Sequence, residues 1–167
     1  MPLPRQEDLP EDYQYLLSED ALGERNVIRA IANNPAVLQS YMRYGTTLWT
    51  ETELTDRERE LVILAVARAL DSAYEWHQHV ELGQDAGVSL EAIRAIGRED
   101  TDAFEGDERA LLDYATAFAV GEVTDTVSDD LAAAYGESTV AEVAMLASHY
   151  VATARVLDGL DVPVEGE

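Results

Sequence analysis

The chain has 167 residues, of which 34 are Asp or Glu and 11 are Arg, with neither Lys nor Cys, so the formal net charge is −23. The missing Cys excludes disulfides, thiolate nucleophiles and Cys-based zinc or iron–sulfur sites, and the missing Lys excludes Schiff-base and P-loop lysines. A surface this acidic repels phosphate backbones and anionic lipids, so we expect neither nucleic acid nor a membrane surface as a partner.

The acidic residues are spread along the chain and form no run of five or more like charges. A moderately acidic surface keeps a protein soluble, but this imbalance predicts a halophilic protein adapted to a salt-rich cytoplasm. The longest uninterrupted apolar run, Leu61–Ala67, is far shorter than the about 20 residues that span a bilayer. The N-terminal segment has no apolar signal core, so we expect a cytoplasmic location.

Capping residues and apolar spacing predict helices along almost the whole chain. Residues 1–17, rich in Pro and acidic side chains, are expected to form an extended arm, and residues 18–167 a single domain. The predicted helices cover about 24–32, 35–49, 55–70, 72–86, 89–96, 108–120, 128–135 and 139–158. No strand-like alternation occurs, so the expected fold class is all-α.

Three of these helices begin with the capping-box pattern, in which a Ser or Thr is followed three residues later by Glu. The boxes start at Thr55, Ser72 and Thr139, and Ser128 is expected to cap the short helix before the last one. The helix after Thr55 is apolar all round over residues 61–67, so we expect it to be the central buried helix.

The chain has three histidines, His77, His79 and His149, all in predicted helices. His77 and His79 are two residues apart and point to nearly opposite helix faces, so they cannot share a metal ion, and no metal site is expected. His79 shares its face with Glu75 and Ser72. A carboxylate one turn away raises the pKa of an imidazole and orients it, which suits general acid–base catalysis.

Glu60 is the second unusual residue, because it stands where the apolar helix turns inward. A buried carboxylate needs a partner such as His79 or an Arg. Two interpretations stay open for each glutamate: Glu60 is either a buried site residue or a first-turn acid favoured by the helix dipole, and Glu75 is either a site residue or only the end of a capping box.

The segment RERELVILAVARALDSAYEWHQHVELGQDAGVSLEAIRAI, residues 57–96, resembles the carboxymuconolactone decarboxylase family, within the alkyl hydroperoxidase D-like superfamily. The segments NVIRAIANNPAVLQSYMRYGTTLW and LASHYVATARVLDGLDVP fit as well, so the resemblance covers about residues 24–163. It implies a helical AhpD-like fold and assembly as a homotrimer or homohexamer.

Hydroperoxidase members of that family carry a Glu, eleven residues, C-x-x-C, three residues and a His. With His79 as the final histidine, the glutamate falls on Glu60 and the two cysteines on Ser72 and Glu75. A serine or a glutamate cannot form the sulfenic acid or disulfide of thiol turnover. A peroxiredoxin-like activity therefore remains only as a label carried by the family.

The lactone decarboxylase branch also lacks the cysteine pair, keeps the histidine and uses no cofactor. The resemblance implies an enzyme with His79 as acid–base catalyst and Glu60 and Glu75 as orienting or proton-relaying carboxylates. We expect Ser72, Arg68 and Trp76 to bind substrate, with Arg68 as the partner of an anion. The alternative is a non-catalytic oligomeric scaffold of the same fold, and a small-molecule ligand is compatible with either.

Overall fold

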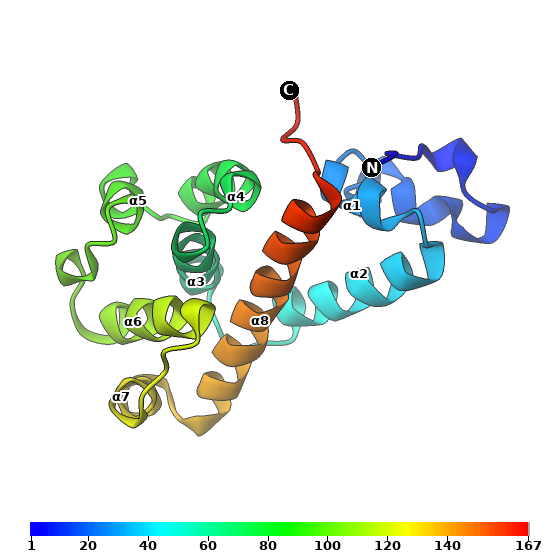
Figure 1. Cartoon of the computed structure of the whole chain (residues 1–167). Coiled ribbons are helices and arrows are strands. Elements are labelled where there is room, and N and C mark those ends of the chain that lie inside the picture. Colours follow the sequence, from blue (N-terminus) through cyan, green and yellow to red (C-terminus); the bar gives the residue numbers. More distant parts are fainter. Residues whose placement is uncertain (167) are drawn as a thin grey trace. The chain divides into compact units, whose positions relative to one another are not determined.

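A computed structural model describes residues 1–166, and in this part of the chain every regular element is a helix (Figure 1). This confirms the all-α prediction. The α-helices are α1 (Asn26–Ile31), α2 (Pro35–Thr50), α3 (Asp56–Ala69), α4 (Ala73–Asp85), α5 (Leu90–Gly97), α6 (Gly106–Val120), α7 (Asp125–Tyr135) and α8 (Glu137–Leu160). Among the described residues, no helix combines the length and apolar character needed to cross a membrane.

The chain divides into two compact units, one made of residues 1–47 with 155–167 and the other of residues 48–154. A single domain over residues 18–167 stays a prediction. The segment expected to be an extended arm forms 3-10 helices at Gln6–Asp8 and Glu11–Leu17, and a third follows at Glu19–Ala21. Three leucines of this segment, Leu9, Leu16 and Leu17, are buried and hold it within its unit. Burial of these apolar side chains favours folded turns over a solvated arm.

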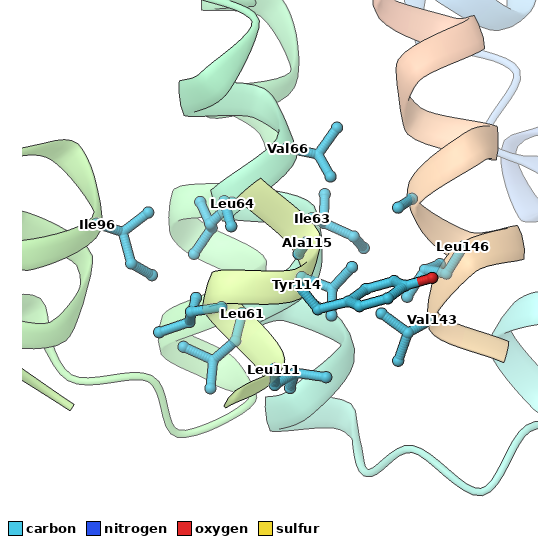
Figure 2. Packing of buried hydrophobic residues seen from close by; sticks show 14 of the residues in the cluster. Leu61, Ile63, Leu64, Val66, Ile96, Leu111, Tyr114, Ala115, Val143 and Leu146 are labelled. Atoms are coloured by element: carbon cyan, nitrogen blue, oxygen red, sulfur yellow. The ribbon is translucent and has the colours of Figure 1, made fainter. Parts of the chain in front are cut away.

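Helix α3 is the centre of the second unit, as its apolar sequence predicts. Every residue from Leu61 to Ala67 is at most 3% exposed, because the helix packs against both α4 and α6. Figure 2 shows α3 side chains such as Leu61 and Ile63 among residues of α5, α6 and α8. A fully apolar helix is stable only when neighbours cover it on all sides.

Several predicted helix starts shift by a few residues. Helix α7 begins at Asp125 with Thr124 as its cap, rather than at Ser128, and the Thr124 hydroxyl accepts from the Val127 amide at 3.3 Å. Helix α8 begins at Glu137, directly after Gly136, and the Thr139 hydroxyl donates instead to the Tyr135 carbonyl. The region 98–107, which falls between two predicted helices, contains a 3-10 helix at Thr101–Ala103 and the first two residues of α6. Met145 of α8 is 49% exposed, although neighbours such as Leu146 are buried.

Candidate functional site

A tight turn between α3 and α4 brings the two candidate helices together. Asp71 takes a left-handed conformation with φ of 51°, and the Ser72 amide donates to the Ala67 carbonyl at 2.9 Å. This three-residue connection leaves α3 and α4 as packed neighbours, and Figure 1 shows α4 next to α3. The two helices approach closely at Gly83, where a Cβ atom would lie 3.2 Å from the side chain of Leu64.

Glu60 of α3 and His79 of α4 meet across this helix pair. Oε2 of Glu60 lies 2.9 Å from Nδ1 of His79, and the two residues are 2% and 5% exposed. Glu60 is thus a buried and paired carboxylate, not a solvated first-turn acid. A charge that leaves water needs such a partner, since an unpaired buried carboxylate is strongly unfavourable.

Glu75 approaches the other ring nitrogen of His79. Its Oε2 lies 3.5 Å from Nε2, and the residue is 4% exposed. The capping box predicted from Ser72 and Glu75 is not formed: Ser72 is the N-cap residue of α4, but its side chain makes no capping hydrogen bond. Glu75 lies one turn before His79 on the same helix face and is turned toward the imidazole. Both ring nitrogens therefore face a carboxylate.

This arrangement sets the charge of His79. Burial alone lowers the pKa of an imidazole, but hydrogen bonding and charge attraction from Glu60 and Glu75 outweigh burial and raise the pKa of His79 to about 9. The ring is therefore an imidazolium at neutral pH, with a proton on each nitrogen.

Aromatic side chains pack around His79. The ring of Tyr150 stands edge-on to it, with ring centroids 5.1 Å apart, and the Trp49 ring lies 6.3 Å away. Trp49 Nε1 donates a 3.2 Å hydrogen bond to the Tyr150 hydroxyl, which ties the two rings together. The ring of His149 also stands edge-on to that of Tyr150, with ring centroids 5.3 Å apart. Burial lowers the pKa of His149 to about 4. His149 is thus neutral where His79 is charged.

Arg59, next to Glu60 in sequence, completes the group. Its guanidinium lies over the ring of Trp49, 4.7 Å from the centroid, in a cation–π contact. Arg59 is 4% exposed, and Nη2 is paired with the carboxylate of Asp56. We call Glu60, Glu75 and His79 the acid–base cluster; Trp49, Tyr150 and Arg59 surround it.

The residues predicted to bind substrate lie in different places. Ser72 is buried at the start of α4. Arg68 is directed elsewhere: Nε donates to the Gly97 carbonyl at 3.0 Å, and Nη2 pairs with Glu99 at 2.8 Å. The half-buried Trp76 packs against the same region, since a Cβ atom at Gly97 would lie 3.5 Å from its ring. The structure thus joins Arg68 and Trp76 to the end of α5, not to the acid–base cluster.

His77 is exposed on the outer side of α4, as its two-residue offset from His79 predicts. The sequence reasoning missed Trp49 and Arg59 as neighbours of the cluster. For Arg59 a signal existed, because a charged residue in a helix that is otherwise turning inward must find a partner. No local sequence signal indicated a role for Trp49, because Tyr150, whose hydroxyl accepts its hydrogen bond, is 101 residues away.

No group of three or more His, Asp or Glu side chains in residues 1–166 is arranged to hold a metal ion. A hollow of about 410 Å³ lies between α6 and α7, lined by residues such as Asp107, Arg109 and Asp130. A second, of about 30 Å³, lies beside Arg68 and Glu99. Neither of these two hollows includes a member of the acid–base cluster.

Comparison with known proteins gives the family context. A model of the carboxymuconolactone decarboxylase family matches residues 35–117, about half of the chain, which includes the whole acid–base cluster. No protein among the curated sequences matches.

Solved structures share the fold at low sequence identity. An uncharacterized peroxidase-related protein from Ralstonia eutropha, described as an alkylhydroperoxidase AhpD core, superimposes with a TM-score of 0.86 at 17% identity, covering 99% of this chain and 92% of its own. The debrominase Bmp8 has a TM-score of 0.82 at 18% identity, with coverages of 98% and 90%. A Bmp8 variant was solved in complex with 2,3,4-tribromopyrrole and gives the same values. These likenesses show the AhpD-like fold.

Proposed function

The chain belongs to the carboxymuconolactone decarboxylase family, and we propose that it catalyses cofactor-free proton transfer of the decarboxylase or lyase type on a small carboxylated or lactone-like molecule. One observation carries this proposal: a buried histidine, His79, lies between the side chains of Glu60 and Glu75, which raise its pKa. A perturbed titratable group with specific charged partners in a water-poor setting is typical of acid–base catalysis.

In a decarboxylation, the bond to the carboxylate carbon breaks and CO₂ leaves. The electron pair passes into the conjugated carbonyl system of the substrate, and the resulting carbanion takes a proton. His79 supplies that proton in our proposal. Glu60 keeps the ring oriented through Nδ1, and the longer contact of Glu75 with Nε2 marks the side at which a substrate would displace it. The acid then regains its proton from solvent.

Thiol peroxidase activity is not part of the proposal. Ser72 and Glu75 stand at the positions of the cysteine pair, and the chain has no Cys. The buried contact between Glu75 and His79 gives this position an electrostatic role in place of a redox one.

A non-catalytic scaffold is the second candidate, and burial of the cluster favours it. Glu60 and His79 contact each other directly, and all three members of the cluster are at most 5% exposed. A purely structural ion triad would show the same geometry. The two candidates differ in what His79 does when a substrate is present.

The experiment is a screen of unsaturated lactone acids and β-keto acids for CO₂ release, using the wild type, His79→Gln and His77→Gln. The enzyme proposal expects at least one substrate whose release is lost in His79→Gln and kept in His77→Gln. Equal, background-level release by all three proteins across the panel would favour the scaffold.

We also propose self-assembly as a homotrimer or homohexamer. Val37 and Tyr44 support it, because both are exposed on α2, two helical turns apart, and so lie on one face. Light scattering in molar salt tests this assembly: three- or sixfold the 18.4 kDa chain mass is expected, and a monomer would contradict it.

A further inference from the structure

Arg59 stands apart from the other arginines of the chain. It is the only one of them that is buried within residues 1–166, with its side chain 5% exposed. Its Nε atom is buried and has no hydrogen-bond partner. A buried guanidinium with an unused donor is unfavourable unless something compensates for it, so the position calls for an explanation.

The single ion-pair partner of Arg59 that the structure provides is weakly placed. Nη2 of Arg59 pairs with Asp56, three residues earlier, whose side chain is 82% exposed. An ion pair that reaches into solvent contributes little to stability, and its carboxylate can move away at small cost. Asp56 therefore marks the side of the guanidinium that a solute can reach.

Nε and Nη2 form one edge of the planar guanidinium, and a carboxylate binds best to two such parallel donors. In the structure only one donor of this edge is paired: Nη2 contacts the carboxylate of Asp56, and Nε has no hydrogen-bond partner. A ligand carboxylate could satisfy both donors by replacing Asp56. The guanidinium also lies over the ring of Trp49, which orients it.

The same Trp49 connects this edge to the acid–base cluster. Its ring lies 4.7 Å from the Arg59 guanidinium carbon and 6.3 Å from the His79 ring, and its Nε1 holds the Tyr150 hydroxyl. The whole chain carries a formal net charge of −23, so an anionic substrate needs a dedicated cation to approach.

We propose that Arg59 is the residue that binds the carboxylate of the substrate, through Nε and Nη2 and in place of Asp56, and that Trp49 sets its distance from His79. This inference rests on the proposed function for the nature of the substrate. It replaces Arg68, the anion partner predicted from the sequence, whose guanidinium is held at Gly97 and Glu99.

The test uses crotonate, a small unsaturated carboxylate, and crotonamide, its neutral counterpart of similar shape. Both are titrated, at one fixed salt concentration, into protein carrying Trp76→Phe, so that Trp49 is the remaining tryptophan and can be excited selectively. Crotonate is expected to change the emission saturably and to bind about tenfold or more tightly than crotonamide, which is the worth of a charge-assisted hydrogen bond.

Three variants in that background separate the possible causes. Arg59→Gln should weaken crotonate about tenfold or more and leave crotonamide unchanged, since only the charged, paired donors are lost. Asp56→Asn should tighten crotonate severalfold, because the competing carboxylate is gone. Arg109→Gln is the matched control: it removes an exposed arginine paired with Asp102 and should leave both ligands unaffected.

Any of three results would overturn the assignment. Crotonate and crotonamide could bind with equal affinity, crotonate could give no saturable response, or Asp56→Asn could leave the affinity for crotonate unchanged. The Asp56 variant keeps this test decisive should Arg59→Gln fail to fold. Failure of the proposed function is distinguishable: His79→Gln would then bind crotonate like the wild type while no substrate of the CO₂ screen turned over. Conversely, turnover that depends on His79 but keeps its KM in Arg59→Gln would overturn only the role of Arg59.

Discussion

Nδ1 of His79 lies 2.9 Å from Oε2 of Glu60, 19 residues earlier in the chain, and both side chains are buried. Such a pair is costly to desolvate and does not by itself stabilise a fold. A second carboxyl group, that of Glu75, lies 3.5 Å from the remaining ring nitrogen. The arrangement is therefore better understood as a device that keeps an imidazole protonated than as structural reinforcement.

Stability should fall as the pH rises through the alkaline range. The pKa of His79 is about 9 in the folded chain, against about 6.5 for an unperturbed histidine. Its contribution is fully present below pH of about 6.5 and is lost as the pH rises to about 9. Lys and Cys, which titrate in or near this range, are absent, so the effect should stand out.

Thermal melting between pH 6 and 10 measures this. The wild type should lose melting temperature from pH of about 6.5 to about 9, and His79→Gln should lack that slope. Parallel curves for the two proteins would mean that His79 does not titrate in this window.

Replacing the two neighbouring histidines should have opposite consequences. His79→Ala leaves Glu60 and Glu75 buried without their cation, which should cost about 3–5 kcal/mol of unfolding free energy, and should reduce any turnover by at least about 100-fold. His77→Ala alters only an exposed site and should stay within about 0.5 kcal/mol of the wild type. Urea unfolding and initial rates measure both effects. Equal losses of stability and turnover in the two variants would show that His79 has no role distinct from that of His77.

The helices could be predicted because their signals are local. The Thr55 capping box and the apolar run after it specify α3 within a few residues, and the structure forms that box. Where two caps compete, local patterns fail: Thr124 and Ser128 are both followed by Asp, and only the packed start of α7 shows which one is used. The left-handed Asp71 gave no sequence signal either, since non-glycine residues rarely adopt that conformation.

The acid–base cluster was within reach of the sequence, and its surroundings were not. The sequence from Ser72 to Glu75 is compatible both with a capping box and with a Glu75 side chain directed at His79. In the structure Glu75 contacts the buried His79 and the capping box does not form. Arg59 and Arg68 both interrupt the apolar α3, but packing alone determines that the first is buried and the second reaches the end of α5. Contacts between residues far apart in sequence leave no local trace.

The protein should be inert as a thiol peroxidase. No side chain of the chain can cycle between thiolate and disulfide, so peroxide consumption with a dithiol reductant should equal the protein-free blank. A peroxide-electrode assay in the presence of a metal chelator measures this. Consumption that scales with protein concentration under those conditions would contradict the prediction.

Folding should depend on salt. With 34 acidic residues against 11 arginines, lowering the salt from about 1 M to about 10 mM lengthens the screening distance from about 3 to about 30 Å and exposes self-repulsion. The melting temperature and the size of the assembly should both fall on dialysis. An unchanged melting curve would show that the acidity is not an adaptation to salt.

The most direct test of the account is the titration of His79 itself, followed by NMR of its ring carbon signals in the wild type and in Glu60→Gln. We predict a midpoint near pH 9 in the wild type and a clearly lower one in Glu60→Gln, because burial then works against a single carboxylate. His77→Gln identifies the resonance of the exposed neighbour by its loss. A wild-type midpoint at or below about 6.5, or one that Glu60→Gln does not move, would contradict a buried imidazolium held by carboxylates.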